Sequence, residues 1–205
     1  MIDPKAVVKR GYDLVSRAYR ADDGAEAQYG PWLDLLEVRV PPPAKVLDLG
    51  CGCGVPVARR LAPRYEVLGV DLSPVQIERA RALVPTATFL CADMAALDFA
   101  DASFDALVCL YSIIHLPLAE QRRFIRDLGR WLRPGGMLIA TVGHRAWTGT
   151  ERDWLGVPGG DMWWEHADAA TYRRWLTDAG FNIESERFVP EGTGGHTFVT
   201  ASVSY

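Results

Sequence analysis

The sequence predicts a single α/β domain built on an open, seven-stranded and mostly parallel sheet with helices on both faces. Short apolar segments bounded by glycine or proline alternate with segments in which apolar residues recur at helical spacing. A length of 205 residues and a hydrophobic fraction of 49% fit one sizeable core. No internal repeat or low-complexity tract interrupts this alternation.

The first strands and helices are marked by clear boundary residues. A strand over 46–49 is entered through 41–43, which are all proline, and is ended by glycines. A helix is expected over 55–62, and a second strand over 66–70. The next helix opens at 73–74, because serine caps the first turn and proline suits the first helical position.

The second half continues the alternation. A long amphipathic helix is ended by Pro134, Gly135 and Gly136. The expected helices cover 117–132 and 168–179, and the expected strands cover 87–91, 106–111, 137–142, 182–190 and 196–203.

Charge and composition exclude several classes of protein. The net charge of −4 gives no positive field for nucleic acid, which makes nucleic acid an unexpected partner. No apolar run is long enough to span a bilayer and the N-terminal residues lack a signal-peptide pattern, so we expect a cytoplasmic protein without membrane contact. The spacings of Cys51, Cys53, Cys91 and Cys109 do not match a zinc site, and no metal is expected.

The residues that carry chemistry follow the first two strands. Asp48 and the glycine-rich loop 50–54 come at the end of the first strand, where ligands of such sheets bind. Asp71 ends the second strand, 21 residues after Gly50, and an acid there can accept hydrogen bonds from ribose hydroxyls. Val55 replaces the glycine of a dinucleotide fingerprint and no Gly-Lys-Ser/Thr is present, so the pattern predicts a nucleoside cofactor other than NAD or ATP.

Five segments in order resemble the motifs of the class I S-adenosylmethionine-dependent methyltransferases, of the small-molecule, UbiE/MenG-like type. The resemblance covers about 44–142 and implies a Rossmann-like fold with an antiparallel last strand, S-adenosylmethionine as cofactor and S-adenosylhomocysteine as product. The matching segments are 48–54, 69–74, 91–94, 104–108 followed by 113–117, and 132–136.

The resemblance also implies roles for individual residues. The loop 50–52 is expected against the methionine part and the ribose, Asp71 on the ribose hydroxyls, and Leu72 beside the adenine. Asp93 is expected to accept from the adenine amino group, and the Met94 N–H to reach a ring nitrogen. The full set of expected cofactor residues is Tyr19, Asp48, Gly50, Cys51, Gly52, Asp71, Leu72, Ala92, Asp93, Met94 and Tyr111.

Two of these assignments leave alternatives. Asp48 either touches the cofactor or only organises the loop. Tyr19 belongs to an aromatic series with Tyr12, Tyr29 and Trp32 at roughly helical intervals. This series predicts a helical cap over the cofactor, with Tyr19 near the sulfonium, whose charge suits an aromatic face. The alternative is that these rings pack on the edge of the sheet.

The segment between the fifth strand and the following helix is rich in tryptophan and interrupted by glycine. It is expected to form a lid and the wall of an acceptor site for a planar or apolar molecule, although several rings could be satellite core. The expected acceptor residues are Tyr111, His115, Trp147, Trp154, Trp163 and Trp164. The single domain 1–205 then divides into a cap over 1–43, a cofactor core over 44–142, the lid over 143–167, and a closing helix and strands over 168–205.

A general base is needed only when the acceptor must lose a proton, and imidazole titrates in the right range. The expected catalytic candidates are His115, His144 and His166, with His196 as a weaker fourth. His115 follows the fourth strand, where similar enzymes often carry two adjacent histidines, but here the preceding residue is Ile114. Each histidine could instead be structural.

The leading hypothesis is methyl transfer to an O, N or C atom of a small, aromatic or apolar molecule of secondary metabolism, by a monomer or homodimer. The alternatives are methylation of a protein or RNA, and a protein that binds S-adenosylmethionine without transferring its methyl group. Cofactor motifs indicate binding and do not specify the reaction.

Overall fold

A computed structural model describes residues 3–24 and 28–204. The main sheet has seven strands in the order β3-β2-β1-β4-β5-β9-β8, and β9 runs antiparallel to both of its neighbours. This confirms the expected fold, including the antiparallel last strand. The strands are β1 (Lys45–Leu49), β2 (Glu66–Asp71), β3 (Thr88–Cys91), β4 (Phe104–Cys109), β5 (Leu132–Gly143), β8 (Phe181–Glu191) and β9 (Gly194–Val203).

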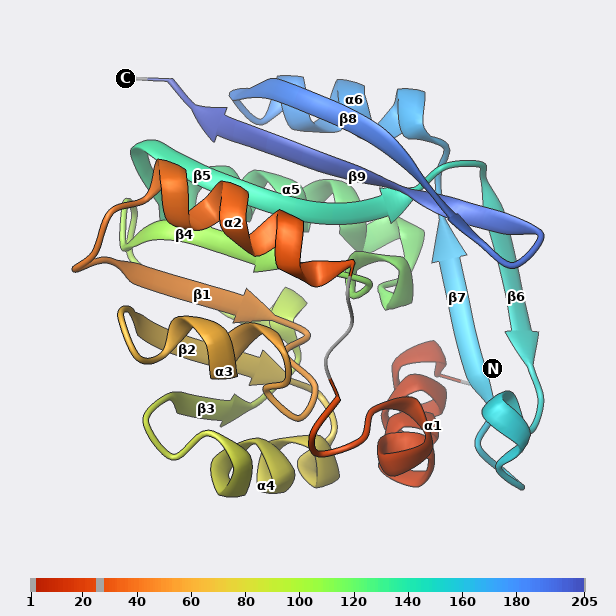
Figure 1. Ribbon diagram of the computed structural model, residues 1–205. Helices are drawn as coiled ribbons and strands as arrows, with labels where there is room; N and C mark the ends of the chain where they lie inside the picture. The colour runs from red at the N-terminus through yellow and green to blue at the C-terminus, as the bar shows by residue number, and fades with distance from the viewer. Residues whose placement is uncertain (1–2, 25–27, 205) are drawn as a thin grey trace.

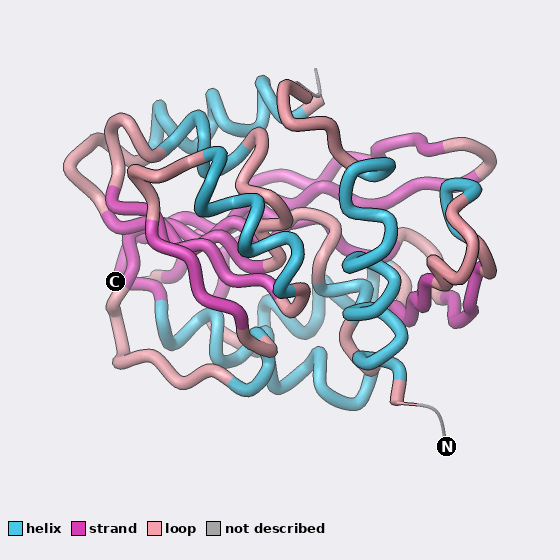
Figure 2. Tube along the Cα trace, turned by 90° about the horizontal axis from the view of Figure 1, so that it is seen from below, coloured by secondary structure: helices cyan, strands magenta, loops and turns pink. Residues whose placement is uncertain are grey.

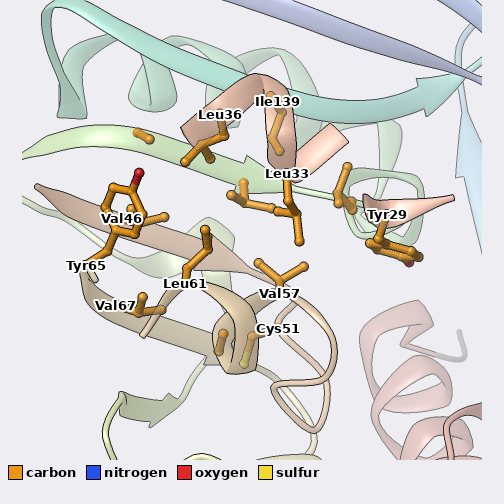
Figure 3. Packing of buried hydrophobic residues seen from close by; sticks show 14 of the residues in the cluster. Tyr29, Leu33, Leu36, Val46, Cys51, Val57, Leu61, Tyr65, Val67 and Ile139 are labelled. Carbon is orange, nitrogen blue, oxygen red and sulfur yellow. The ribbon is translucent and has the colours of Figure 1, made fainter. Parts of the chain in front are cut away.

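Helices cover both faces of the sheet (Figures 1 and 2). One face carries α2 (Tyr29–Arg39), α3 (Val57–Leu61) and α4 (Pro74–Leu83), and the other carries α5 (Leu118–Trp131) and α6 (Ala169–Asp178). Figure 3 shows how Leu33 and Leu36 of α2 pack toward β1, β5 and α3 on the first face. Each face of the sheet therefore has its own buried apolar cluster.

Of the two N-terminal helices, only α1 (Pro4–Tyr19) lies beyond the carboxyl ends of the strands (Figure 1). Four residues of α2 are buried, Tyr29, Trp32, Leu33 and Leu36. Trp32, 2% exposed, stacks on Phe198 of β9 with ring centroids 4.4 Å apart. The expectation of a cap over 1–43 is therefore wrong for α2, because its aromatic spacing serves packing on the sheet.

The tryptophan-rich segment forms a separate hairpin of β6 (Trp147–Glu151) and β7 (Met162–His166), with the short turn η3 (Trp154–Gly156) between them. The hairpin lies beside α1 at the carboxyl end of the sheet (Figure 1). A Cβ at Gly11 of α1 would lie 2.3 Å from the carbonyl oxygen of Asp161, so glycine is required for this close approach.

Some boundaries differ from those expected. Strand β5 begins directly after α5, and 134–136 form an irregular stretch opposite a register shift between Phe104 and Ala106. Helix α3 is shorter than the expected 55–62. Two short 3-10 helices follow β3 and β4, η1 (Met94–Ala96) and η2 (Ile113–His115). In the described residues no helix combines the length and hydropathy needed to cross a bilayer.

Candidate active site

Two cavities meet at the carboxyl ends of the strands. The first, here called the inner cavity, has a volume of about 680 Å³, part of which is open to solvent. Helix α1 covers it, and the loop after β1 and the ends of β2 and β3 form its floor. Its lining includes Lys5, Tyr12, Tyr19, Gly50, Gly52, Asp71, Leu72, Gln76, Ala92, Asp93, Met94, Tyr111 and His115.

The glycine loop is shaped by backbone conformations that side chains disfavour. Gly50 has φ of +76°, and a Cβ there would lie 2.3 Å from the Cβ of Ser112. Gly52 has φ of +54°, and its N–H donates to Oδ2 of Asp71 at 2.9 Å. Oδ1 of Asp71 accepts from the N–H of Ser73, also at 2.9 Å. Burial raises the pKa of Asp71 to about 6 despite these hydrogen bonds. Asp71 thus joins the loop to the start of α4.

Two buried polar atoms behind the loop lack partners. Oδ2 of Asp48 and Nε2 of Gln76 make no hydrogen bond with the described residues, although both side chains are 2% exposed or less. Burial, reinforced by Asp71, raises the pKa of Asp48 to about 8. Both residues line a smaller cavity that continues from the loop and also contacts Cys51. Because buried polar atoms without partners are uncommon, these two indicate a site for a polar ligand group.

At the other end of the inner cavity, Asp93 is held on both oxygens. Oδ1 accepts from the N–H of Ala95, and Oδ2 accepts from Nζ of Lys5 at 2.6 Å. Lys5 also donates to Glu120 at 2.5 Å. Burial opposes the charge on Lys5, but the two carboxylates raise its pKa above the ordinary value. The first turn of α1 is therefore fixed to the end of β3 and to α5.

Polar contacts also fix the rest of α1 to α4. Oγ of Ser16 donates to Oε1 of Gln76 at 2.8 Å, and Nη1 of Arg79 donates to the carbonyl oxygen of Ser16 at 2.7 Å. Oγ of Ser73 donates to Asp13 at 2.6 Å. These residues are buried or half-buried, and they hold α1 over the inner cavity.

Three side chains line both the inner cavity and a larger outer one: Tyr19, Tyr111 and His115. Tyr111 follows β4 with φ of +56°, a left-handed conformation that is rare for aromatic residues. Its N–H donates to Oγ1 of Thr141 on β5. Strained backbone of this kind is concentrated at functional sites, because the surrounding structure must hold it in place.

His115 links α1 to β7 through two hydrogen bonds. Its Nδ1 donates to the carbonyl oxygen of Trp163 at 2.8 Å, and its Nε2 accepts from the Tyr12 hydroxyl at 2.9 Å. Burial lowers the pKa of His115 to about 4. The imidazole is therefore neutral near pH 7, with both nitrogens engaged between α1 and β7. The sequence presents Tyr12 only as one aromatic residue of a series, because its partner lies 103 residues away.

The outer cavity lies between α1, the hairpin β6–β7 and the turn between β8 and β9. Its volume is about 2410 Å³, part of which is open to solvent. Its lining includes Tyr29, Arg145, Trp147, Glu151, Trp154, Trp164, Phe188 and Glu191, and the four histidines His115, His144, His166 and His196. No group of three metal-binding side chains with suitable geometry occurs in the described part of the chain.

One expected acceptor residue is placed differently. Trp163 is not part of the lining, and only its carbonyl group takes part, as the acceptor for His115. Side chains alternate between the two faces of a strand, so Trp164 and His166 face the outer cavity and Trp163 faces away. The placement of the Trp163 ring in the acceptor wall is therefore wrong.

The other two histidines named as base candidates have local partners. Nδ1 of His144 is 3.1 Å from Oγ1 of Thr197, and its ring lies 4.5 Å from that of Phe188. Nδ1 of His166 is 3.4 Å from the carbonyl oxygen of Ala167, and burial lowers its pKa below the ordinary value. Both rings still border the outer cavity.

Comparison with known proteins also indicates a methyltransferase domain. Residues 46–136 match a family model described as a methyltransferase domain. The chain is 41% identical over 120 residues to the 2-methyl-6-phytyl-1,4-hydroquinone methyltransferase of Synechocystis, a match that covers 56% of this chain and 35% of that protein. The chain thus spans about a third of the length of this relative.

Solved structures show the same fold across nearly the whole chain. A magnesium protoporphyrin IX methyltransferase from Synechocystis, solved with S-adenosylhomocysteine bound, gives a TM-score of 0.74 at 21% identity and covers 98% of this chain and 100% of its own. The cyclase SpnF gives 0.73 at 22% identity and covers 99% and 97%. These structures confirm the fold, and the family match identifies 46–136 as similar to a methyltransferase domain.

Proposed function

We propose that this chain is an S-adenosylmethionine-dependent methyltransferase that acts on a small molecule. The observation that carries the proposal is the shared wall of Tyr19, Tyr111 and His115, which separates the inner cavity from the aromatic outer cavity. A methyl donor in the inner cavity and an acceptor in the outer one would meet across this wall. Methyl transfer needs chiefly such alignment, in a site from which water is excluded.

The inner cavity suits S-adenosylmethionine at each end. Asp71 can accept from the ribose hydroxyls, and its carboxylate is already oriented by the N–H groups of Gly52 and Ser73. Asp48 and Gln76 offer an acceptor and a donor to the ammonium and carboxylate of the methionine part, which would satisfy their unpartnered atoms. The cofactor supplies an activated methyl group on a positively charged sulfur.

At the adenine end, Leu72, Ala92 and Met94 supply apolar surface. Asp93 can accept from the adenine amino group if it exchanges or shares its bond with Lys5. Tyr19, whose ring lies 5.4 Å from those of both Tyr12 and Trp154, provides aromatic faces that favour a sulfonium.

The outer cavity favours a small acceptor. Helix α1 and the hairpin border it, and its walls are rich in aromatic side chains, which suit a planar or apolar molecule. The net charge of −4 supports this choice over nucleic acid. A cytoplasmic location, a role in secondary metabolism and a monomeric or homodimeric state are parts of the same proposal.

Calorimetric titration with S-adenosylmethionine and S-adenosylhomocysteine, with NAD as control, tests the cofactor assignment. We expect micromolar binding of the first two and none of NAD. Asp71→Ala should weaken binding by about 1 to 3 kcal/mol, since it removes hydrogen bonds to the ribose. The matched control is Asp101→Ala, which removes an exposed carboxylate paired with Arg130. Unchanged affinity in Asp71→Ala would remove the ribose assignment.

A further inference from the structure

Glu191 and His196 face each other across the turn that joins β8 to β9. Oε2 of Glu191 lies 3.0 Å from Nδ1 of His196. Strand pairing fixes this geometry, because Glu191 pairs with Gly194 and His196 lies between Val189 of β8 and Gly143 of β5. Both side chains line the outer cavity.

The pairing determines which nitrogen of His196 carries the proton. An ionised carboxylate only accepts hydrogen bonds, so in the neutral imidazole Nδ1 carries the proton and Nε2 has the lone pair. Nε2 makes no hydrogen bond with the described residues. Burial would raise the pKa of Glu191, but contacts with His196 and Tyr111 lower it below the ordinary value, which keeps the carboxylate charged.

His196 also lies next to the wall between the two cavities. Its ring packs edge-on against that of Tyr111, with centroids 5.3 Å apart. Tyr111 lines both cavities, so an acceptor that approaches the wall from the outer side passes beside His196. A general base must lie within hydrogen-bonding reach of the proton it removes, and His196 lines the cavity from which an acceptor would approach the wall.

The other three histidines are less suited to this task. His115 has both nitrogens engaged inside the protein. His144 contacts the hydroxyl of Thr197, and His166 contacts a backbone carbonyl group. Within the described residues, His196 is the one histidine paired with a carboxylate, which is the arrangement that orients an imidazole and stabilises its protonated form.

We propose that His196, oriented by Glu191, is the general base of methyl transfer and that the acceptor atom is a hydroxyl oxygen on an aromatic ring. This inference rests on the proposed function. The acceptor O–H proton moves to Nε2 of His196, and the oxygen forms a bond to the methyl carbon. The bond between that carbon and sulfur breaks, its electron pair stays on sulfur, and S-adenosylhomocysteine and a methyl ether result.

The chemistry of the cavity favours this acceptor class. Trp147, Trp154 and Trp164 present aromatic surface that suits a planar ring. A phenolic hydroxyl has a pKa near 10, as in tyrosine, so an imidazole can assist its deprotonation as the new bond forms. A neutral amine attacks through its own lone pair and has less need of a base.

The charged and titratable groups around His196 come from several elements. Glu191 lies on β8, and His166 lies on β7 with its ring 5.9 Å away. Tyr111 follows β4, and His144 and Arg145 follow the end of β5 in the same cavity. A pH profile of the reaction therefore has to be compared between variants.

The test measures transfer of a radiolabelled methyl group from S-adenosylmethionine to matched pairs of phenols and anilines, naphthols and naphthylamines. We expect transfer to hydroxyl compounds. His196→Gln should lower kcat by about 100-fold while S-adenosylmethionine affinity changes less than twofold, and the acidic limb of the pH profile should disappear. Glu191→Gln should lower kcat by about 10-fold and shift that limb, which a merely structural role would not do. Glu184→Gln, which alters an exposed ion pair on the same strand, serves as control.

Several outcomes would overturn this inference without touching the cofactor assignment. These are an unchanged kcat in His196→Gln, transfer to amines alone, and no transfer to any panel compound by a protein that binds S-adenosylmethionine. Nitrogen-15 NMR of the imidazoles gives a readout that needs no acceptor. It should show His196 as the Nδ1–H tautomer, and the Nε2–H tautomer would contradict the role. Failure to bind S-adenosylmethionine would instead count against the proposed function.

Discussion

Lys5 in the first turn of α1 and Asp93 at the end of β3 form an ion pair of 2.6 Å, although 88 residues separate them in the chain. The pair joins the helix that covers the inner cavity to the carboxylate expected to face the adenine. Together with the contacts between Ser16 and Arg79, it holds α1 in a closed position. We therefore expect these contacts to slow ligand exchange.

Lys5→Met should accelerate the release of S-adenosylhomocysteine. A half-buried ion pair contributes about 1 kcal/mol, which corresponds to roughly fivefold in the dissociation rate. Stopped-flow displacement measures that rate, and hydrogen exchange should show faster opening of α1. Arg17→Met is the matched control, since it removes an exposed ion pair from the same helix. Equal dissociation rates in the two variants would show that the ion pair of Lys5 does not hold α1 over the inner cavity.

Asp48 should make stability depend on pH. Its folded pKa of about 8 lies far above the unfolded value, so the folded state binds the extra proton and the free energy of unfolding falls as pH rises toward 8. Asp48→Asn removes this dependence. Between pH 6.5 and 8, wild type should lose about 1.5 kcal/mol relative to the variant, as measured by urea unfolding. This window lies above the titration of Asp71 and His115.

Binding should also displace the proton on Asp48. If the ammonium of the methionine part lies against this carboxyl group, S-adenosylmethionine favours the ionised form. Calorimetry at pH 7 in buffers of different ionisation enthalpy should then detect proton release in wild type and less in Asp48→Asn. Identical release in both proteins would place the ammonium elsewhere.

The sequence predicted the sheet and the position of the glycine-rich loop well, because both depend on local patterns. Glycines after β1 and an acid at the end of β2 are positioned by strand ends, which alternating apolar segments reveal. The position of α2 on the face of the sheet could not be predicted in this way, because the spacing of Tyr29 and Trp32 suits a helix over the cofactor and a helix packed on the sheet equally well. Only the tertiary contact of Trp32 with Phe198 separates the two.

Contacts between segments that are distant in the chain also could not be predicted from the sequence. The bond between Tyr12 and His115 depends on how α1 crosses the sheet, and it changes His115 from a base candidate into a connector. His196 gained its carboxylate partner through the register of β8 and β9. If β7 were paired with β6 one residue out of its present register, Trp163 instead of Trp164 would face the outer cavity.

His115→Phe should destabilise the protein and loosen α1, because it removes two buried hydrogen bonds. We expect a loss of about 1 to 3 kcal/mol in the free energy of unfolding. Tyr12→Phe, which removes only one of these bonds, should cost about half as much. Since the folded pKa of about 4 lies below the ordinary 6.5, the His115 contribution is complete above pH 6.5 and is lost as pH falls toward 4. Chemical unfolding at pH 5 and pH 7 measures both effects, and a pH-independent difference between wild type and His115→Phe would contradict them.

Trp164 should control binding of the acceptor. Its ring lies 5.5 Å from Trp154, 6.0 Å from Trp147 and 5.8 Å from His115, so it joins the aromatic wall to the border between the cavities. Trp164→Leu should raise KM about 10-fold for an acceptor that the wild-type enzyme methylates, while kcat and cofactor affinity change little. The reason is that the ring binds the acceptor without taking part in the reaction. The neighbouring Trp163→Leu tests loss of an equally large ring that faces away from the cavity. Equal increases in KM for the two variants would mean that the hairpin as a whole, and not the face presented by Trp164, shapes the acceptor site.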